Sequence, residues 1–421
     1  MAGRQNAVPW SRGFSWPMGQ MGGRDLMRRF GKWLGRVLLA ALCAALVIGL
    51  WKGEEIKRLM AVNSLFEPDL IVRNFSNMDA AFLHTPVGEA QTPPSALPDG
   101  PKMTLPDGTA AWLAARKVTS LVVLSNGQLV HESYHLGTKA EDRRISWSLA
   151  KSYISALTGI VLAQGSIASL DDPVTRYAPR LKGGAYDGAT VRNVLNMATG
   201  VTFDEDYTDY DSDINRMGRV LALGGLMDDF AAGLTQTFAR PGSEWQYVSI
   251  DTHVLGMVIR AATGRSVVDL MGAHIITPLG LESTPYYLTD GAGVAFALGG
   301  LNMTTRDYAR FGQMMAQHGA WNGRQIVPKN WVIDSTTASA PTGPDEYGYG
   351  YQWWMPRDAR PREYMGRGIY GQYLYINEEQ GVVVALTAAD AAFRDADVQQ
   401  QNIALFREIA DRVQGDANGK R

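Results

Sequence analysis

Residues 146–165 read SWSLAKSYISALTGIVLAQG, and the remainder of the chain can be interpreted outward from this stretch. A helix from Leu149 to Leu162 would be apolar on nearly every side, with Lys151 as its only side chain charged at neutral pH. The pattern predicts a helix buried in the middle of a domain and ended by Gly165. A lysine in such a helix requires an explanation.

The spacing of two side chains in this stretch would allow them to act together in catalysis. Ser148 and Lys151 are three positions apart, which on a helix puts both on one face with Cβ atoms about 5–6 Å apart. Burial favours the neutral, basic form of a lysine, and a serine needs such a base to become a nucleophile. If Ser146 is the N-cap, the backbone N–H of Ser148 has no intrahelical partner and could hold a developing oxyanion.

A simpler interpretation of the pair is that Lys151 extends to solvent and Ser148 only caps the helix. A Ser-x-x-Lys pattern is short, so by itself it supports catalysis weakly. Among the serines of the chain, however, only Ser148 has a lysine three residues later, and it lies where the predicted helix is most buried. The pair is therefore a candidate nucleophile and base.

The composition is that of an ordinary globular protein with enough residues for a large core. The chain has 421 residues, 46% of them hydrophobic and 19% charged, and a formal net charge of −2. The chain has no excess of basic residues that would indicate a nucleic-acid partner. The one cysteine, Cys43, excludes a disulfide within the chain. Nothing in the pattern indicates an oligomeric state.

The N-terminal segment has the charge pattern of a membrane signal. Residues 1–36 contain seven Arg or Lys against the single acid Asp25, and residues 37–51 carry no charge. We expect a basic cytoplasmic N-terminus over 1–36 and a membrane anchor or uncleaved signal over 37–51, because no small-x-small cleavage site follows Trp51. This predicts a single-pass protein of the inner (cytoplasmic) membrane, with the later residues periplasmic or otherwise extracytoplasmic. The alternative is a buried core helix.

The rest of the chain divides into an arm and linker over 52–104, which is proline-rich toward its end, and one domain over 105–421. Strands at both ends of that domain and helices between them predict one antiparallel sheet covered by helices, with a helical subdomain inserted. The expected hairpins are Val118–Leu124 with Gln128–His135, joined at Asn126-Gly127, and Tyr370–Ile376 with Val382–Leu386. Further helices are expected at Thr109–Arg116, Thr190–Met197, Asn215–Leu223, Asp251–Thr263 and Val398–Val413.

Three motifs are similar to those of a known family. They are Ser148-Leu149-Ala150-Lys151, Tyr247-Val248-Ser249, and Gly366-Arg367-Gly368. Their order and spacing resemble the serine β-lactamase and penicillin-binding-protein superfamily, most of all its class C-related branch with esterases and 6-aminohexanoate-dimer hydrolases. The resemblance covers roughly Leu105–Val413. It implies an α/β (α+β) fold, in which a β-lactamase/transpeptidase-like antiparallel sheet is flanked by helices and carries an inserted all-helical subdomain.

The resemblance also implies a role for each matching residue. Ser148 would be the nucleophile, Lys151 its proton acceptor, and Tyr247 the partner that relays the proton to the leaving group. The backbone N–H groups of Ser148 and Ile369 would form the oxyanion hole. A tyrosine beside a lysine cation can have a lowered pKa, which would suit Tyr247 to proton transfer.

Two of the motifs depart from the family pattern. Ser249 stands where the family often has asparagine, and Gly366 stands where it often has lysine or histidine, with Arg367 one place later. The cation that usually meets a β-lactam carboxylate is therefore missing or displaced. We expect Ser249, Arg367 and Gly368 to bind substrate, together with Tyr207, because Glu205-Asp206-Tyr207 resembles the dimer-hydrolase loop whose tyrosine touches the substrate amide.

We therefore predict a serine hydrolase that cleaves a small amide or ester through an acyl-enzyme on Ser148, without metal or cofactor. A short linear amide of the 6-aminohexanoate type is one candidate substrate. One alternative is a β-lactamase or D-Ala-D-Ala peptidase, and another is a catalytically silent, membrane-tethered binding protein. A Ser-His-Asp hydrolase is disfavoured, because the chain has no Gly-x-Ser-x-Gly and its histidines lack nucleophile-elbow or metal-ligand spacing.

Overall fold

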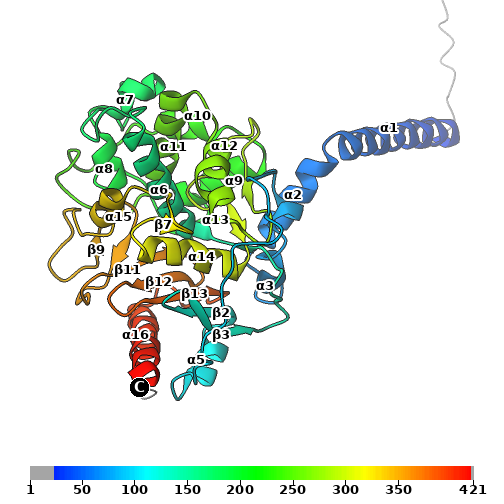
Figure 1. Cartoon of the computed structure of the whole chain (residues 1–421). Helices are drawn as coiled ribbons and strands as arrows, with labels where there is room; N and C mark the ends of the chain where they lie inside the picture. Colours follow the sequence, from blue (N-terminus) through cyan, green and yellow to red (C-terminus); the bar gives the residue numbers. More distant parts are fainter. Residues whose placement is uncertain (1–22, 419–421) are drawn as a thin grey trace, which may run out of the picture. The chain divides into compact units, whose positions relative to one another are not determined.

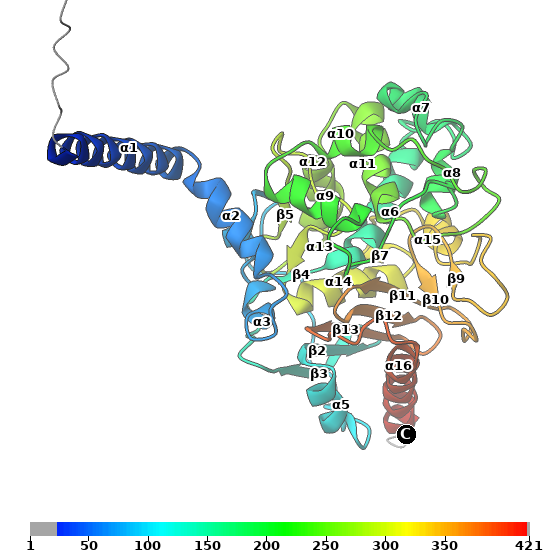
Figure 2. The same cartoon turned by 180° about the vertical axis from the view of Figure 1, so that it is seen from behind.

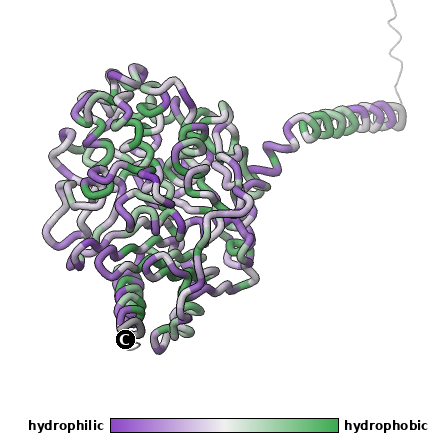
Figure 3. Tube along the Cα trace, in the orientation of Figure 1, coloured by the Kyte–Doolittle hydropathy of each residue, from purple (hydrophilic) through white to green (hydrophobic). Residues whose placement is uncertain are grey.

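The computed structural model describes residues 23–418, which divide into an N-terminal unit ending at Ile56 and a main unit that begins at Lys57. The N-terminal unit contains α1 (Gly23–Trp51) and the start of α2 (Gly53–Asn63). Within α1, Met27–Trp51 is long and apolar enough to cross a membrane, and Figure 3 shows the hydrophobic colour along most of it. A signal sequence would share these features. The basic residues before Gly23 lie outside the described residues.

The main unit is built on one antiparallel sheet with the strand order β3-β2-β13-β12-β11-β10-β9 (Figure 1). Both predicted hairpins are confirmed, and β13 pairs with β2, so that the two ends of the domain meet in the middle of the sheet. The strands are β2 (Val118–Ser125), β3 (Gln128–Tyr134), β9 (Gly348–Tyr349), β10 (Trp354–Met355), β11 (Glu363–Gly368), β12 (Gln372–Asn377) and β13 (Val382–Ala388).

Helices cover both faces of this sheet. On one face, α14 (Thr305–Ala316) lies so close that a Cβ added at Gly312 would be 2.6 Å from a Val383 side-chain atom. On the other face, α5 (Thr109–Ala115) and α16 (Ala396–Asn418) pack on the sheet, as Figure 2 shows. Successive side chains of β2 point to opposite faces of the sheet. Val122 and Val123 therefore belong to two different apolar clusters, one on each face. The helices α5 and α16 were predicted, whereas α14 was not.

The inserted helical part surrounds α6 (Ala150–Ala163), in which residues 150–161 are all buried, as predicted. The predicted helices near α8, α9 and α11 are also confirmed. The elements of this part are α7 (Val174–Tyr177), η2 (Pro179–Leu181), α8 (Val191–Leu195), α9 (Asp213–Ala222), α10 (Met227–Ala232), α11 (Ser249–Thr263), α12 (Val267–Met271), η3 (Gly272–Ile276) and α13 (Thr277–Leu279). The segments that follow it contain β7 (Ala320–Trp321), β8 (Arg324–Gln325) and α15 (Lys329–Ser335).

Most of the stretch 52–104, expected to be arm and linker, belongs to the main unit, because that unit begins at Lys57. Phe75 is fully buried, and the buried Arg144 donates from Nη1 to the Val72 carbonyl (2.5 Å) and to Ser76 Oγ (2.9 Å). This segment also adds the first strand of a second sheet, with the order β1-β5-β6-β4. The elements are α3 (Ile71–Asn74), α4 (Met78–Ala81), β1 (His84–Pro86), β4 (Arg144–Ile145), β5 (Tyr286–Leu288) and β6 (Leu301–Met303).

Candidate active site

Ser148 lies in a single 3₁₀ turn, η1 (Trp147–Leu149), which leads directly into α6. Trp147 has a left-handed φ of 44°, which is uncommon for a residue with a side chain. Its ring packs against Phe75, with ring centroids 5.4 Å apart, so tertiary contacts hold this conformation. Ser146 precedes the turn as predicted, but its hydroxyl donates to the Trp147 carbonyl and does not cap a backbone N–H.

Lys151 faces Ser148 from one turn further along the helix. Its Nζ lies 3.3 Å from Ser148 Oγ and donates a 2.9 Å hydrogen bond to the Leu298 carbonyl. The side chain is buried, with only 2% of its surface exposed. Desolvation lowers the pKa of Lys151 to about 7, although the carboxyl groups of Glu205 and Asp251 act in the opposite direction. A substantial fraction of this amine is therefore neutral and basic at neutral pH.

Tyr247 reaches the same place from the loop before α11. Its ring lies 5.4 Å from Lys151 Nζ and stacks on Trp354 of β10 at 5.4 Å between centroids. Burial raises the pKa of Tyr247, and the nearby Glu205 carboxyl adds to the rise, while a hydrogen bond with Ser148 opposes it only in part. The expectation of a lowered tyrosine pKa is thus wrong. The phenol stays neutral and can pass a proton only as an O–H group.

Glu205 belongs to this cluster, although the resemblance of the Glu205-Asp206-Tyr207 loop led to a predicted site role for Tyr207 alone. Its carboxyl accepts a 2.6 Å hydrogen bond from the Ser249 backbone N–H and a 3.2 Å bond from the Tyr207 hydroxyl. Burial raises the pKa of Glu205, with Lys151 as the main opposing influence. The signal that could have found it is its place next to Tyr207 in the Glu205-Asp206-Tyr207 loop.

Ser148 and Ile369, the two residues expected to form the oxyanion hole, both line the space beside the Ser148 hydroxyl. In the described part of the chain, the N–H groups of Ser148 and Ile369 donate to no backbone carbonyl. The strand β11 approaches η1 closely because it carries glycine there: a Cβ on Gly368 would lie 2.4 Å from the Ser146 carbonyl oxygen. These N–H groups are the ones that the resemblance assigns to the oxyanion hole, and the assignment stays a prediction.

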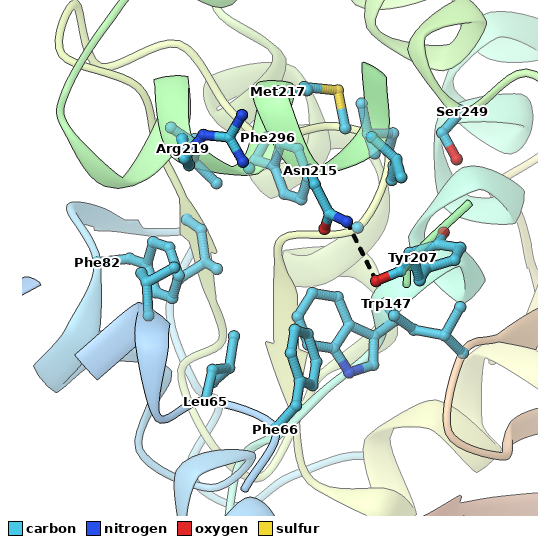
Figure 4. A pocket seen from close by; sticks show the side chains of 18 of the residues that line it. Leu65, Phe66, Phe82, Trp147, Tyr207, Asn215, Met217, Arg219, Ser249 and Phe296 are labelled. Carbon is cyan, nitrogen blue, oxygen red and sulfur yellow. Dashed lines mark hydrogen bonds between the residues drawn. The ribbon is translucent and has the colours of Figure 1, made fainter. Parts of the chain in front are cut away.

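Two cavities meet at Ser148 and Ile369, which line both of them. The larger has a volume of about 340 Å³ and is mostly apolar; in Figure 4 the Phe66, Phe82, Trp147 and Phe296 side chains surround it. The smaller has a volume of about 260 Å³. Its lining residues are more polar and include Glu205, Tyr207, Tyr247, Trp354, Arg367, Arg394 and Gln399.

The other predicted residues also lie at this junction. Tyr207 lines both cavities, Ser249 lines the larger one with its side chain fully buried, and Gly368 lines the smaller. Arg367 lines the smaller cavity, where its guanidinium lies 4.9 Å from the Trp354 ring centroid and has no acidic partner among residues 23–418. His253, in contrast, is buried against Asp228 at 2.8 Å and lines neither cavity.

Comparison with known proteins gives a consistent match. A family model described as Beta-lactamase matches residues 112–408. The 6-aminohexanoate-dimer hydrolase of Paenarthrobacter ureafaciens is 30% identical over 288 residues, which cover 64% of this chain and 72% of the relative. A solved structure assigned as a 6-aminohexanoate-dimer hydrolase from Bacillus anthracis has a TM-score of 0.75 at 24% identity, covering 83% of this chain and 96% of the other. The octameric penicillin-binding protein homologue from Pyrococcus abyssi has a TM-score of 0.54 at 19% identity, covering 71% and 76%. These structural likenesses confirm the predicted fold.

Proposed function

Because the chain belongs to the beta-lactamase family and is a serine hydrolase of the amidase and esterase type, we propose that it cleaves a small amide or ester through an acyl-enzyme on Ser148. One observation carries the proposal: a buried lysine amine with a lowered pKa lies 3.3 Å from a serine hydroxyl that opens onto two cavities. A base beside a hydroxyl at this distance is the arrangement that activates a serine.

The first step forms the acyl-enzyme's tetrahedral precursor. Neutral Lys151 accepts the hydroxyl proton as Ser148 Oγ bonds to the substrate carbonyl carbon. The carbonyl oxygen becomes an oxyanion, and the partner-free N–H groups of Ser148 and Ile369 stabilise it. Loss of one such donor in other hydrolases costs about 10²–10³-fold in rate.

The second step expels the leaving group. The proton held by Lys151 passes through the Tyr247 hydroxyl to the leaving nitrogen or oxygen, while the carbon–heteroatom bond breaks and the ester to Ser148 remains. A water molecule then attacks this ester and gives a proton to Tyr247 and Lys151, which return it to Ser148 Oγ as the ester bond breaks. The acid product departs, and the Ser148 hydroxyl is restored. A neutral phenol suits this relay, because it accepts one proton as it donates another.

Glu205 is proposed to position the relay. Its carboxyl accepts hydrogen bonds from the Ser249 N–H and the Tyr207 hydroxyl, which connects the start of α11 to the Glu205-Asp206-Tyr207 loop. Tyr247 lies just before α11. Arg367 is proposed to bind an anionic or aromatic part of the leaving group, because its guanidinium faces the smaller cavity without an acidic partner in the described chain.

The proposal extends to location. We propose that residues 37–51 anchor the chain in the inner membrane, with residues 1–36 on the cytoplasmic side and the residues after 52, which include the hydrolase domain 105–421, outside the cytoplasm. The apolar helix Met27–Trp51 and the basic residues that precede it support this orientation.

A screen of esters, amides and β-lactams against wild type, Ser148→Ala and Ser155→Ala tests the function. Ser155 is a matched control, because it lies on α6 with a buried hydroxyl that has no hydrogen-bond partner in residues 23–418. We expect Ser148→Ala to lose at least about 10³-fold in turnover and Ser155→Ala to keep it. Full activity of folded Ser148→Ala would refute the assignment, and a lasting penicilloyl adduct on Ser148 would favour a penicillin-interactive enzyme.

A further inference from the structure

The two cavities at Ser148 divide the substrate into an acyl side and a leaving-group side. Tyr247, which the proposed mechanism uses to protonate the leaving group, lines only the smaller cavity. The larger cavity shares Ser148 and Ile369 but not Tyr247. A carbonyl held between those two residues therefore directs its leaving group toward Tyr247 and its acyl group into the larger cavity.

The larger cavity has an apolar interior without an acid. Its lining residues include Leu65, Phe82, Met217, Leu221 and Phe296, and none of the described lining residues is Asp or Glu. The one cation, Arg219, is engaged at the edge, where its Nη1 donates to the Tyr210 carbonyl (2.6 Å) and its guanidinium lies 3.9 Å from the Tyr210 ring centroid. An ammonium group at the end of an acyl chain would find no counter-charge here.

Gly218 leaves space at the wall formed by α9. Ile214, Gly218 and Leu221 follow each other at positions i, i+4 and i+7 on the cavity-lining face of this helix. A Cβ added at Gly218 would meet no atom within 4 Å. The helical backbone does not require glycine at this position, and the missing side chain leaves this part of the cavity lining open.

The opposite wall comes from the segment that leads into the domain. Val62, Leu65 and Phe66 line the cavity, and they lie outside the residues 112–408 that match the family model. In Figure 4, Phe66 lies beside Trp147, and their ring centroids are 5.7 Å apart. Val62 follows Trp51, the last residue of the apolar helix, by eleven positions. The segment next to the proposed anchor thus forms part of the acyl site.

We propose that the preferred substrates are amides or esters of an uncharged aliphatic acid, whose chain occupies the cavity between α9 and residues 62–66, with Gly218 setting its depth. This proposal takes its reaction, cleavage through an acyl-enzyme on Ser148, from the proposed function. A cavity of about 340 Å³ has room for a chain of on the order of ten carbons, since a group of the size of water takes about 30 Å³. The proposed acyl group is thus an uncharged aliphatic chain and not a 6-aminohexanoyl group.

A series of p-nitrophenyl esters from acetyl to dodecanoyl tests chain selection. We expect kcat/KM to rise about three- to fourfold per methylene and to level off near the length that fills the cavity. The sharpest pair is heptanoyl against 6-aminohexanoyl, which differ by a terminal methyl in place of an ammonium group. The proposal predicts at least a tenfold preference for heptanoyl, and equal rates or the reverse preference would overturn it.

Gly218→Phe tests the depth of the cavity, with Gly415→Phe on the exposed end of α16 as the matched control. Both are helical glycines with open space around an added Cβ, but only Gly218 lines the cavity. We expect Gly218→Phe to reduce kcat/KM for the octanoyl ester at least tenfold while changing the acetyl ester less than threefold. Equal losses on both esters, or no loss on either, would contradict the assignment.

A binding measurement separates this inference from the proposed reaction. Ser148→Ala is titrated with decanoate by calorimetry, alone and combined with Gly218→Phe or Gly415→Phe. Binding that Gly218→Phe removes and Gly415→Phe keeps would support the acyl cavity even if no ester were turned over. Absence of decanoate binding, or a decanoate affinity that Gly218→Phe leaves unchanged, would overturn the assignment of the acyl cavity even if Ser148 proved to be the nucleophile.

Discussion

The proposed chemistry depends on the protonation state of one amine, that of Lys151. Lys151 is surrounded by protein, and desolvation lowers its pKa to about 7, more than Glu205 and Asp251 raise it. Asp251 itself is buried with Tyr186 and Thr199 as hydrogen-bond donors, and burial raises its pKa to about 8. The Asp251 carboxyl favours the protonated form of Lys151, but desolvation is the larger influence and favours the neutral amine.

This environment predicts a pH profile. Only neutral Lys151 can accept the serine proton, and its neutral fraction rises as pH rises through its folded pKa. We expect kcat/KM for a simple ester to increase through an inflection near pH 7 and then to reach a plateau. The profile is measured from pH 5 to 9 on wild type.

Lys151→Arg supplies the matching variant, because arginine stays protonated over this whole range. It should lose about 10²–10⁴-fold in kcat/KM and show no inflection near pH 7. The control is Lys182→Arg at an exposed lysine, which should keep the wild-type profile. An unchanged profile in Lys151→Arg would exclude this lysine as the base.

The sequence was most informative at the scale of single residues. Ser148 and Lys151 follow from helical spacing, and Tyr247 follows from a resemblance that brings a distant segment to them. The pKa of Tyr247 was predicted in the wrong direction, because burial depends on neighbours such as Trp354 that lie a hundred residues away. The Leu298 carbonyl that holds Lys151 has no side-chain signal at all.

At the scale of elements, the site depends on how closely β11 approaches η1. Gly366 and Gly368 lie against the η1 region, where added Cβ atoms would be 2.3 Å from Leu149 Cδ1 and 2.4 Å from the Ser146 carbonyl oxygen. The first contact is the end of a flexible side chain, whereas the second is backbone. The two glycines are therefore not equivalent.

Gly368→Ala should damage catalysis more than Gly366→Ala. An alanine at 368 pushes β11 and the Ile369 N–H away from Ser148, and a displacement of about 1 Å can cost on the order of 100-fold in rate. Gly366→Ala should cost less than tenfold, because Leu149 can change rotamer. The comparison is made by kcat on one ester, with thermal unfolding to verify that both variants fold. A smaller loss in Gly368→Ala than in Gly366→Ala would contradict the oxyanion role of this strand.

Element prediction succeeded where the signal was local. The Asn126-Gly127 pair correctly predicted the first hairpin, and the apolar run after Ser148 correctly predicted α6. The helix α14 was missed, although Thr304 caps it by accepting from the Asp307 N–H. The sheet β1-β5-β6-β4 could not be predicted, because its strands have two or three residues and pair across large sequence separations.

At the scale of the whole molecule, the division between the two units does not coincide with the end of the predicted arm. The main unit begins at Lys57, and residues after it supply buried side chains such as Leu65, Phe75 and Met78. The buried guanidinium of Arg144 binds the Val72 carbonyl and Ser76 and so ties this segment to the strand that precedes Ser148. The segment thus belongs to the hydrolase and not to the anchor.

Two truncations test this division. A chain that begins at Gly53 should fold and keep its kcat/KM on a soluble ester within about twofold, because it retains the main unit. A chain that begins at Val87 loses the buried Phe75 and Met78, each worth about 2–5 kcal/mol, which approaches the total stability of a domain. It should be unfolded by circular dichroism. A folded, active chain from Val87 would contradict the structural role of residues 57–86.

The claim on which the account depends is that Ser148 carries the acyl group during turnover. Intact-protein mass spectrometry after millisecond quench of wild type with an excess of p-nitrophenyl ester, followed by peptide mapping, measures it most directly. The account predicts a mass increase equal to one acyl group, located on Ser148 and absent from Ser148→Ala. Turnover without any acylated protein, or an acyl group on another residue that persists in Ser148→Ala, would contradict it.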